Sequence, residues 1–427
     1  MILSILNIAG LLLTKGKGVL GNYELEKWGN PTISHGFEDF VNRLSTDGLH
    51  EIIKDGNPLH VWVNGINLNS DYILVGFHGL MPRENSIPPF FFFRGVAEKL
   101  GIGLISISDP SLYVSSKLSL AWYLGNNNYK NLTQDLSFLL DMIVEKTERK
   151  LILSGGSGGG FAALNIHRHM HHGDNVRSFV WNPQTEITKY NWVNIKQYFN
   201  DCVEENTDSK LKYIIEQLQE KKIPFKIEKR PDLKQLIFVN GYDHAHIRKH
   251  VSRFIPKDKS DENRVFIGDW GNGHIQPDNS TVVSVLKSIM SNKDFDIILE
   301  EVYKPSKPVL NYKKNKEMLD DLLTCRASIL ANQDERVLCI KSNLYEHFIG
   351  YQMRIKVISK SGEVIFNSDY LLGADICELY FKTSIEKLQK LRGSTVELKI
   401  EDISLSENSY KFAFDKIKNI HRYSRVI

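Results

Sequence analysis

The segment Lys150–Leu164, KLILSGGSGGGFAAL, constrains the fold of this chain more than any other. A run of β-forming residues leads directly into glycines on both sides of Ser157, and a stretch of small and apolar residues with helical character follows. This pattern is typical of a G-x-S-x-G nucleophile elbow, in which a serine sits on a sharp turn between a strand and a helix. The neighbouring positions need glycine because the backbone passes too close for side chains, and the helix N-terminus favours developing negative charge. We therefore expect Ser157 to be a nucleophile.

Two other interpretations of these glycines stay open. They could cradle a dinucleotide phosphate, but the strict G-x-G-x-x-G pattern counted from Gly156 fails because Phe161 stands at its last position. A looser form, Gly158-x-Gly160-x-x-Ala163, does fit, although no N-terminal βαβ unit or well-placed acidic residue supports it. The segment could also be a structural turn with no chemistry.

Strand and helix patterns alternate on both sides of the elbow, from about residue 58 to 295. The strand candidates are mostly continuous apolar runs, as in parallel strands that are covered on both faces. We predict strands at His60–Asn64, Tyr72–Phe77, Leu104–Ser108, Lys150–Ser154, Ser178–Trp181, Gln235–Asn240 and Val265–Asp269. We predict helices at Leu132–Lys146, Leu211–Glu220 and Thr281–Met290. This alternation predicts a doubly wound, mostly parallel α/β sheet.

The pattern changes after Tyr303–Pro308, YKPSKP, which has the prolines and lysines of a linker. One helical stretch near Asn315–Leu323 is followed by period-two alternation, which predicts a small, mostly antiparallel domain of sandwich type. Its strand candidates are Tyr351–Val357, Val364–Phe366, Thr395–Glu401 and Tyr410–Phe414. We therefore divide the chain into an N-terminal extension (1–54), a catalytic α/β domain (55–302) and a β-rich C-terminal domain (303–427).

A serine elbow predicts an acid and a histidine that follow it in the order Ser, acid, His, each after a later strand. Asp243 comes soon after the predicted strand that ends at Asn240, and His274 lies in a glycine-rich loop after the next strand. His274 would take the hydroxyl proton of Ser157, and Asp243 would hold the imidazole tautomer and stabilise its cation. Asp243 could instead cap a helix that begins at His244, or be a ligand together with His244 and His246, although the triad order explains it better. His274 could be a surface-loop histidine.

An oxyanion hole needs two N–H donors, one from the residue after the nucleophile and one from the loop after an early strand. We assign the first to Gly158 and the second to the backbone of Gly79 or Leu80, with His78 lining the site; the alternative is a simple strand-ending turn. Three further polar residues follow strands of the same sheet and are expected near the substrate: Asp109, Asn182 and Gln184.

Two other groups of residues are weaker candidates for a functional site. A histidine tract could hold a metal, but it ends the helix after the elbow, where cationic residues meet the negative end of the dipole, and we predict no metal there. Its members are His167, His169, His171 and His172. Pro88–Phe93, PPFFFF, could line an acyl or sugar pocket, or could be a buried strand or the start of a helix.

Charge and cysteine content exclude some classes of function. Fifty-four Lys and Arg against 51 Asp and Glu leave a net charge of +3, whereas a protein that grips nucleic acid needs a concentrated positive excess. The four cysteines form no Cys-x-x-Cys pair, which is typical of reduced thiols in an intracellular protein.

The N-terminal residues Met1–Leu13 are apolar but too few to span a bilayer as a helix. No basic residue precedes the apolar run and no clear cleavage site follows it, so we expect a buried strand or helix in preference to a signal peptide. No other segment approaches the ~20 apolar residues of a membrane helix, and we predict no transmembrane segment.

The series His78-Gly79, Gly155–Phe161, Asn240–His244 and Gly273-His274 resembles α/β-hydrolase-type proteins from bacterial capsule loci. It is most similar to the XcbB/CpsF family of capsular polysaccharide biosynthesis proteins, and also to capsule O-acetyltransferases, over about residues 55–295. The resemblance implies an α/β-hydrolase-like sheet without a bound cofactor. It also implies a cytoplasmic enzyme, free or peripheral at the inner face of the membrane, that moves acetyl from acetyl-CoA to a sugar hydroxyl of a surface polysaccharide. Ser157, Asp243 and His274 match the triad positions.

Three functions follow from these observations and stay open. The first is a serine O-acyltransferase, and the second is a carbohydrate esterase or deacetylase with the same triad and water as the acceptor. The third is a non-catalytic subunit of a polysaccharide assembly, against which the complete Ser, Asp and His series counts.

Overall fold

The computed structural model describes most of the chain up to residue 302 and the strands that follow. The described residues are 22–205, 210–240, 243, 246–254, 261–268, 270–271, 273–302, 326–331, 336–341, 352–358, 361–367, 371–372, 378–383, 395–401, 407–413 and 421–424. The predictions for Met1–Leu13, Tyr303–Pro308 and Asn315–Leu323 lie outside these residues.

The chain divides into two compact units. The first comprises Met1–Ile237, Ser260–Asn263 and Asp278–Lys293, and the second comprises Phe238–Lys259, Arg264–Pro277 and Asp294–Ile427. Ser157 therefore belongs to the first unit, and Asp243 and His274 belong to the second.

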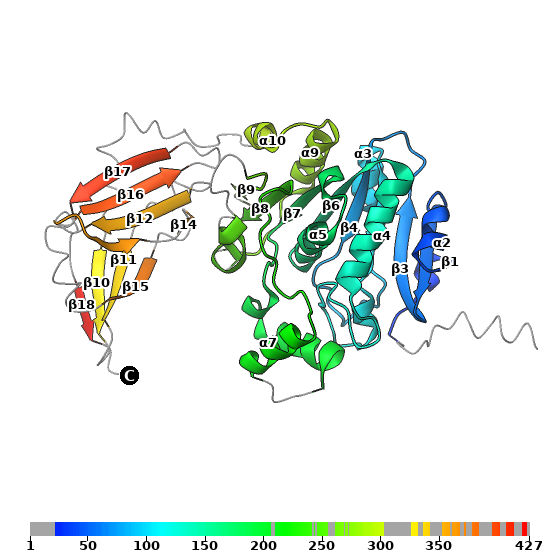
Figure 1. Ribbon diagram of the computed structural model, residues 1–427, viewed down its shortest axis with the longest axis horizontal. Helices are drawn as coiled ribbons and strands as arrows, with labels where there is room; N and C mark the ends of the chain where they lie inside the picture. Colours follow the sequence, from blue (N-terminus) through cyan, green and yellow to red (C-terminus); the bar gives the residue numbers. More distant parts are fainter. Residues whose placement is uncertain are drawn as a thin grey trace, which may run out of the picture. The chain divides into compact units, whose positions relative to one another are not determined.

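A nine-stranded sheet dominates the α/β part of the structure, in the order β1-β2-β3-β5-β4-β6-β7-β8-β9 (Figure 1). The strands are β1 (Thr32–His35), β2 (Gly48–Lys54), β3 (Asn57–Asn64), β4 (Tyr72–Phe77), β5 (Gly103–Ile107), β6 (Lys150–Gly156), β7 (Val176–Trp181), β8 (Gln235–Asn240) and β9 (Arg264–Gly268). The central pairs β5·β4, β4·β6 and β6·β7 are parallel, whereas β3 runs antiparallel to both β2 and β5. The prediction of a doubly wound, mostly parallel sheet is confirmed.

Continuous apolar sequence in the central strands reflects burial on both faces. Every residue of β4, β5 and β8 is buried, as expected when helices cover both sides of a parallel sheet. The helices are α2 (Phe37–Asn42), α3 (Arg94–Leu100), α4 (Leu132–Thr147), α5 (Gly158–His169), α6 (Trp192–Tyr198), α7 (Leu211–Glu220), α9 (Asn279–Met290) and α10 (Phe295–Val302). In the first unit α4 packs between α2 and α5, and α3 packs against α9 on the other face of the sheet (Figure 1).

Two segments differ from their expected structure. The sheet begins before residue 55, because β1 and β2 of the predicted N-terminal extension pair with each other and β2 pairs with β3. Pro88–Phe93 is not a strand, and only its last residue takes part in the start of a helix, because Phe93 is the N-cap of α3. The segment runs beside β5, where the amides of Phe90 and Phe92 donate to the hydroxyls of Ser108 and Ser106.

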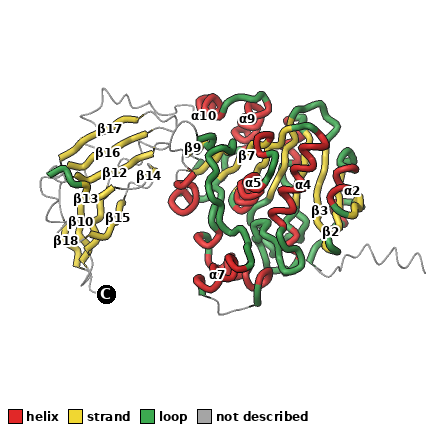
Figure 2. Tube along the Cα trace, in the orientation of Figure 1, coloured by secondary structure: helices red, strands yellow, loops and turns green. Residues whose placement is uncertain are grey.

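The described residues beyond 302 are mostly β-strands, shown in yellow in Figure 2. They are β10 (Arg326–Ala331), β11 (Arg336–Lys341), β12 (Gln352–Ile358), β13 (Val364–Asn367), β14 (Leu371–Leu372), β15 (Glu378–Thr383), β16 (Thr395–Glu401), β17 (Glu407–Ala413) and β18 (His421–Ser424). One sheet has the order β15-β11-β10-β18, and a second has β13-β12-β16-β17 with β14 beside β12. All their pairs are antiparallel except β10·β18, in keeping with the period-two pattern; the sandwich arrangement stays a prediction.

Candidate active site

Ser157 lies between the end of β6 and the start of α5 with φ 55° and ψ −116°. This left-handed backbone conformation costs a non-glycine residue on the order of 1–3 kcal/mol and persists only where the surroundings enforce it. The main chain of Ser157 is held at both ends: its N–H donates to the Trp181 carbonyl at 3.0 Å, and its carbonyl accepts from Phe161 at 3.1 Å. The serine of this turn is thus strained and fixed, as a nucleophile elbow requires.

The glycines beside Ser157 are required by close packing. A Cβ atom at Gly156 would lie 2.1 Å from the Trp181 indole nitrogen, and one at Gly158 would lie 2.4 Å from a methyl carbon of Leu120. A Cβ atom at Gly159 would lie 2.4 Å from the Phe77 carbonyl oxygen, so α5 approaches β4 more closely than any side chain permits. A doubly wound sheet with a serine on such a turn defines an α/β-hydrolase-like protein.

The hydroxyl of Ser157 has a donor within the protein. The side-chain amide of Gln184 donates to Oγ at 2.7 Å, and the Gln184 oxygen accepts from the Trp122 indole N–H at 2.8 Å, which fixes the amide orientation. Gln184 is fully buried, so the residue predicted to contact substrate lies directly against the serine. Because Oγ accepts this bond, the proton of Ser157 can be given to a base.

The loop after β4 lies against the elbow. A Cβ atom at Gly79 would lie 2.9 Å from the Gly156 carbonyl oxygen, 3.6 Å from the Ser157 Cβ and 3.7 Å from the Gly158 nitrogen. Within the part of the chain that the structure describes, the amides of Gly158 and Leu80 have no acceptor. Two unsatisfied N–H groups on adjoining segments are what an oxyanion hole needs.

His78 is a buried, neutral support for this loop. Its Nε2 accepts the Asp109 amide at 3.1 Å, so the ring proton is on Nδ1, which donates to the Gly79 carbonyl at 2.9 Å. Burial lowers the pKa of His78 to about 4. The Leu80 N–H belongs to the same planar peptide as the Gly79 carbonyl and points the opposite way. By holding the carbonyl, His78 fixes the direction of that amide.

Asp109 and Asn182 lie inside the first unit. The Asp109 carboxylate accepts the Ser111 amide at 3.0 Å and the Tyr123 amide at 2.7 Å, and burial raises the pKa of Asp109 to about 6. Asn182 is buried and has φ 42°. Asp109 therefore ties two loops together, and substrate contact by either residue stays a prediction.

In the second unit, Asp243 binds two histidines. Its Oδ2 lies 2.5 Å from His274 Nδ1, and the same carboxylate lies 2.9 Å from His246 Nδ1. Oδ1 also accepts the His246 amide at 3.2 Å. Asp243 therefore has two roles: it binds His274, and it caps the turn that follows Asp243 in the chain. Burial raises the pKa of Asp243, but hydrogen bonds from His246 and His274 outweigh it and hold that pKa well below its usual range.

The geometry of His274 suits a general base. Its Nδ1 is occupied by Asp243, which leaves Nε2 of the half-exposed ring as the remaining nitrogen. The His246 ring lies over it, with centroids 4.2 Å apart. Sequence reasoning missed His246 as a second partner of Asp243, although the spacing of three residues on one turn could have suggested it.

Asn240, at the end of β8, anchors the loop that carries His274. Its amide nitrogen donates to the carbonyls of Gly271 at 2.6 Å and Gly273 at 2.7 Å, and its oxygen accepts the Trp270 amide at 3.1 Å. One feature of the sequence indicates this role: Asn240 is a polar residue at the end of an apolar strand, three residues before Asp243.

The same carboxylate and imidazoles could also hold a metal ion. Ligand atoms of Asp243, His246 and His274 lie within 4.8 Å of one another, and two histidines with a carboxylate are a zinc donor set. The histidine tract is different. Both ring nitrogens of buried His167 contact protein oxygens, those of Ser178 and Gly173, and His172 contacts Glu145.

Comparison with protein-family models finds no match, and a search of curated proteins finds no relative. Solved structures with similar folds include a glycosylation-associated protein complex from Streptococcus agalactiae, at 14% identity and TM-score 0.38, which covers 56% of this chain and 45% of that one. A capsule O-acetyltransferase of Neisseria meningitidis serogroup A matches at 14% identity and TM-score 0.38, over 56% of this chain and 95% of that one. An S-formylglutathione hydrolase from Agrobacterium tumefaciens matches at 11% identity and TM-score 0.35, over 60% and 95%. The activities in these descriptions are those of the matched proteins.

In the described part of the chain, no helix has both the length and the apolar character needed to cross a membrane.

Proposed function

We propose that this protein is a serine-dependent O-acyltransferase that acetylates a bacterial capsular or surface polysaccharide, with Ser157, His274 and Asp243 as its triad. The observation that carries the proposal is Ser157 itself. A non-glycine residue is held at φ 55° between a central parallel strand and a helix, and its hydroxyl accepts a hydrogen bond. Such strain is maintained where an exposed, oriented nucleophile is needed.

The first half of the reaction forms an acyl-enzyme. His274 Nε2 takes the Ser157 proton as Oγ attacks the acetyl carbonyl of acetyl-CoA. The amides of Gly158 and Leu80 bind the resulting oxyanion, and Asp243 stabilises the imidazolium. When the tetrahedral intermediate breaks down, the carbon–sulfur bond opens and His274 returns the proton to the coenzyme A thiolate.

The second half transfers the acetyl group to a sugar. His274 takes the proton of an acceptor hydroxyl as its oxygen attacks the acetyl-enzyme, and that proton returns to Ser157 as the ester breaks. The hydrolase alternative differs only in the attacking group, since water replaces the sugar hydroxyl. The resemblance to capsule proteins of the XcbB/CpsF family, carried by His78-Gly79, the elbow and Gly273-His274, favours the sugar.

Intact mass spectrometry after incubation with acetyl-CoA tests the first half. The wild type should gain one acetyl group, Ser157→Ala should gain none, and Ser291→Ala, a control serine outside the site, should behave as the wild type. Acetylation of the Ser157→Ala protein at the wild-type rate would refute the proposal.

Adding a non-acetylated capsule oligosaccharide tests the second half. An acetylated glycan is expected, whereas release of acetate alone would identify an esterase. Activity should persist in EDTA because the proposed chemistry uses no metal. Loss of activity in EDTA with recovery on zinc addition would instead assign Asp243, His246 and His274 to a metal site.

A further inference from the structure

A chain of buried hydrogen bonds in the first unit ends on the nucleophile. The Trp122 indole N–H donates to Gln184 Oε1 at 2.8 Å, and Gln184 Nε2 donates to Ser157 Oγ at 2.7 Å. Both Trp122 and Gln184 are fully buried. An indole N–H can only donate, so the Gln184 oxygen must face Trp122 and its nitrogen must face Ser157. Trp122 therefore determines that Oγ meets a donor and not an acceptor.

The main chain holds Gln184 in the same place. Its backbone N–H donates to the Ser157 carbonyl at 3.3 Å, so the main chain and the side chain of Gln184 both bind the serine. A Cβ atom at Gly158 would lie 3.5 Å from Gln184 Oε1 and 3.5 Å from Trp122 Cδ1. The residue after the nucleophile therefore packs beside both side chains of the hydrogen-bond chain.

The segments that carry this chain are strained, as Ser157 is. Trp122 and Tyr123 have φ 54° and 58°, and Asn182, two residues before Gln184, has φ 42°. Positive φ is uncommon outside glycine, and it is a steric outlier for bulky residues such as tryptophan and tyrosine. Such strain persists where the surroundings enforce it, and it gathers at functional sites. Three turns from separate parts of the sequence are therefore strained around one hydroxyl group.

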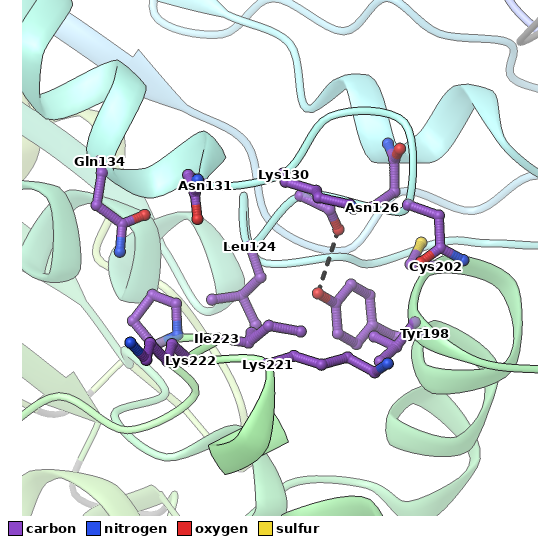
Figure 3. Close-up of a pocket in the computed structure, with 14 residues that line it drawn as sticks. Leu124, Asn126, Lys130, Asn131, Gln134, Tyr198, Cys202, Lys221, Lys222 and Ile223 are labelled. Carbon is purple, nitrogen blue, oxygen red and sulfur yellow. Dashed lines mark hydrogen bonds between the residues drawn. The ribbon is translucent and has the colours of Figure 1, made fainter. Parts of the chain in front are cut away.

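Hydrogen bonds and ring packing fix the turn at Trp122. The Tyr123 amide donates to the Asp109 carboxylate at 2.7 Å. The Trp122 ring packs edge to face against the Tyr198 ring, with centroids 5.8 Å apart, and the Tyr198 hydroxyl donates to the Gly125 carbonyl at 3.2 Å. Tyr198 makes this last bond at the wall of a pocket of about 300 Å³ (Figure 3). The Trp122 side chain is thus held in place, which lets it fix the orientation of Gln184.

We propose that Gln184 is a catalytic residue that stabilises negative charge on Ser157 Oγ, and that Trp122 is the positioning residue that orients its amide. This inference rests on the proposed function, because it needs Ser157 to be the nucleophile. A serine oxygen is bonded to Cβ and to its proton and has two lone pairs. Gln184 occupies one lone pair and leaves the other for the acyl carbon. As the general base takes the proton, charge grows on Oγ and the hydrogen bond from Gln184 becomes charge-assisted and stronger.

The same hydrogen bond acts when the acyl group leaves. In the acetyl-enzyme Oγ is an ester oxygen with little charge, so the bond from Gln184 is weaker there than in the transition states on either side. When the acceptor oxygen bonds to the acyl carbon, the bond from that carbon to Oγ breaks and its electron pair goes to Oγ. The acceptor proton passes through the base to the same oxygen. An interaction that is stronger in the transition state than in the ground state accelerates the step, so Gln184 should speed both halves of the reaction with sugar or with water as acceptor.

Acetylation of Ser157 by p-nitrophenyl acetate tests this role without coenzyme A or a glycan. The burst of nitrophenolate measures attack by Oγ, and loss of acetyl from the isolated acetyl-enzyme, followed by intact mass, measures its departure. Gln184→Met keeps the approximate size of the side chain but removes the donor, and should slow both steps about 10- to 100-fold. Gln235→Met makes the same change at a buried glutamine that begins β8, and both rates should stay at the wild-type value.

Gln184→Glu gives a readout that a merely structural role would not move. The carboxylic acid of this variant can accept from Trp122 and donate to Oγ, whereas its carboxylate can only accept. Burst rates are divided by the folded fraction from circular dichroism. The ratio of the variant rate to the wild-type rate should then rise about tenfold as the pH falls from 8.5 to 5.5, because burial favours the neutral acid. Gln235→Glu should give a ratio that does not change with pH.

Trp122→Phe keeps a ring but removes the indole donor, so the Gln184 amide can turn over. This variant should slow both steps about three- to tenfold. Wild-type rates in Trp122→Phe would overturn the positioning role of Trp122.

The outcomes separate this inference from the proposed function. Wild-type rates in Gln184→Met, or a Gln184→Glu ratio that is independent of pH, would overturn the role of Gln184 and leave Ser157 as the nucleophile. A wild-type protein that gains no more acetyl than Ser157→Ala would overturn the proposed function and this inference together. Release of acetate to water alone would decide against the transferase and leave the role of Gln184 supported.

Discussion

Replacing Ser157 by glycine should make the protein more stable than replacing it by alanine. Both changes remove the hydroxyl that accepts from Gln184, so the loss of that bond is the same in each. They differ at the backbone, because alanine keeps the strain of φ 55° and ψ −116° whereas glycine adopts these angles freely.

The size of the difference follows from two opposing terms. Relief of the strained backbone contributes about 1–3 kcal/mol in favour of glycine. The greater freedom of glycine in the unfolded chain opposes this by about 0.4–1 kcal/mol. The difference in unfolding free energy therefore lies between about 0 and 2.6 kcal/mol in favour of glycine, and its midpoint of about 1.3 kcal/mol corresponds to roughly 3–5 °C in melting temperature for a unit of this size.

Thermal unfolding followed by tryptophan fluorescence measures this, since Trp122 and Trp181 both lie beside the elbow. Ser154, three residues earlier in the interior of β6, is the matched control: there glycine should be about 0.5–1 kcal/mol less stable than alanine. If Ser157→Gly melts at or below Ser157→Ala, the turn is not strained and the structural case for a nucleophile elbow fails.

Three further outcomes are expected. Asn240→Ala should lower kcat about 10- to 100-fold in a transferase assay with KM little changed, because the loop of His274 loses two hydrogen bonds; an unchanged kcat would remove Asn240 from the positioning of that loop. Burial lowers the pKa of His167 from 6.5 to about 4, so the unfolded chain alone takes up this proton between those pH values and stability falls as the pH drops through them. His167→Gln should flatten that fall in urea titrations at pH 7, 5.5 and 4.5, and an equal slope in both proteins would contradict the assignment. Gly159→Ala should destabilise the protein by about 2 kcal/mol by urea unfolding, because its Cβ would meet the Phe77 carbonyl at 2.4 Å; wild-type stability would show that α5 can move away from β4.

Local sequence was sufficient for seven of the nine strands of the sheet, but not for β1 and β2, which lie in the predicted N-terminal extension. The expected strands Tyr72–Phe77 and Gln235–Asn240 and the helix Leu211–Glu220 have the predicted bounds, because runs of β-branched residues and helical spacing act over a few residues. Pro88–Phe93 was not predictable in this way. Its amides bond to serine hydroxyls at the end of β5, a tertiary contact that no local pattern encodes.

The same division applies to the site. The glycines around Ser157 and the pairing of Asp243 with His274 could be expected, since the chemistry demands those residue types in that order. The Gln184 amide on Ser157 and the second histidine on Asp243 were not, because each depends on side chains that converge from separate turns.

By itself, the sequence determined that a serine with flanking glycines stands between a strand and a helix of a doubly wound sheet. Only the tertiary structure decided what the elbow is packed against: Trp181 over Gly156, Leu120 over Gly158, and the Phe77 carbonyl over Gly159. The physical reason is the separation along the chain over which each property is set. Glycine is a local property of the chain, whereas the absence of room for any other residue is set by segments that folding brings from elsewhere.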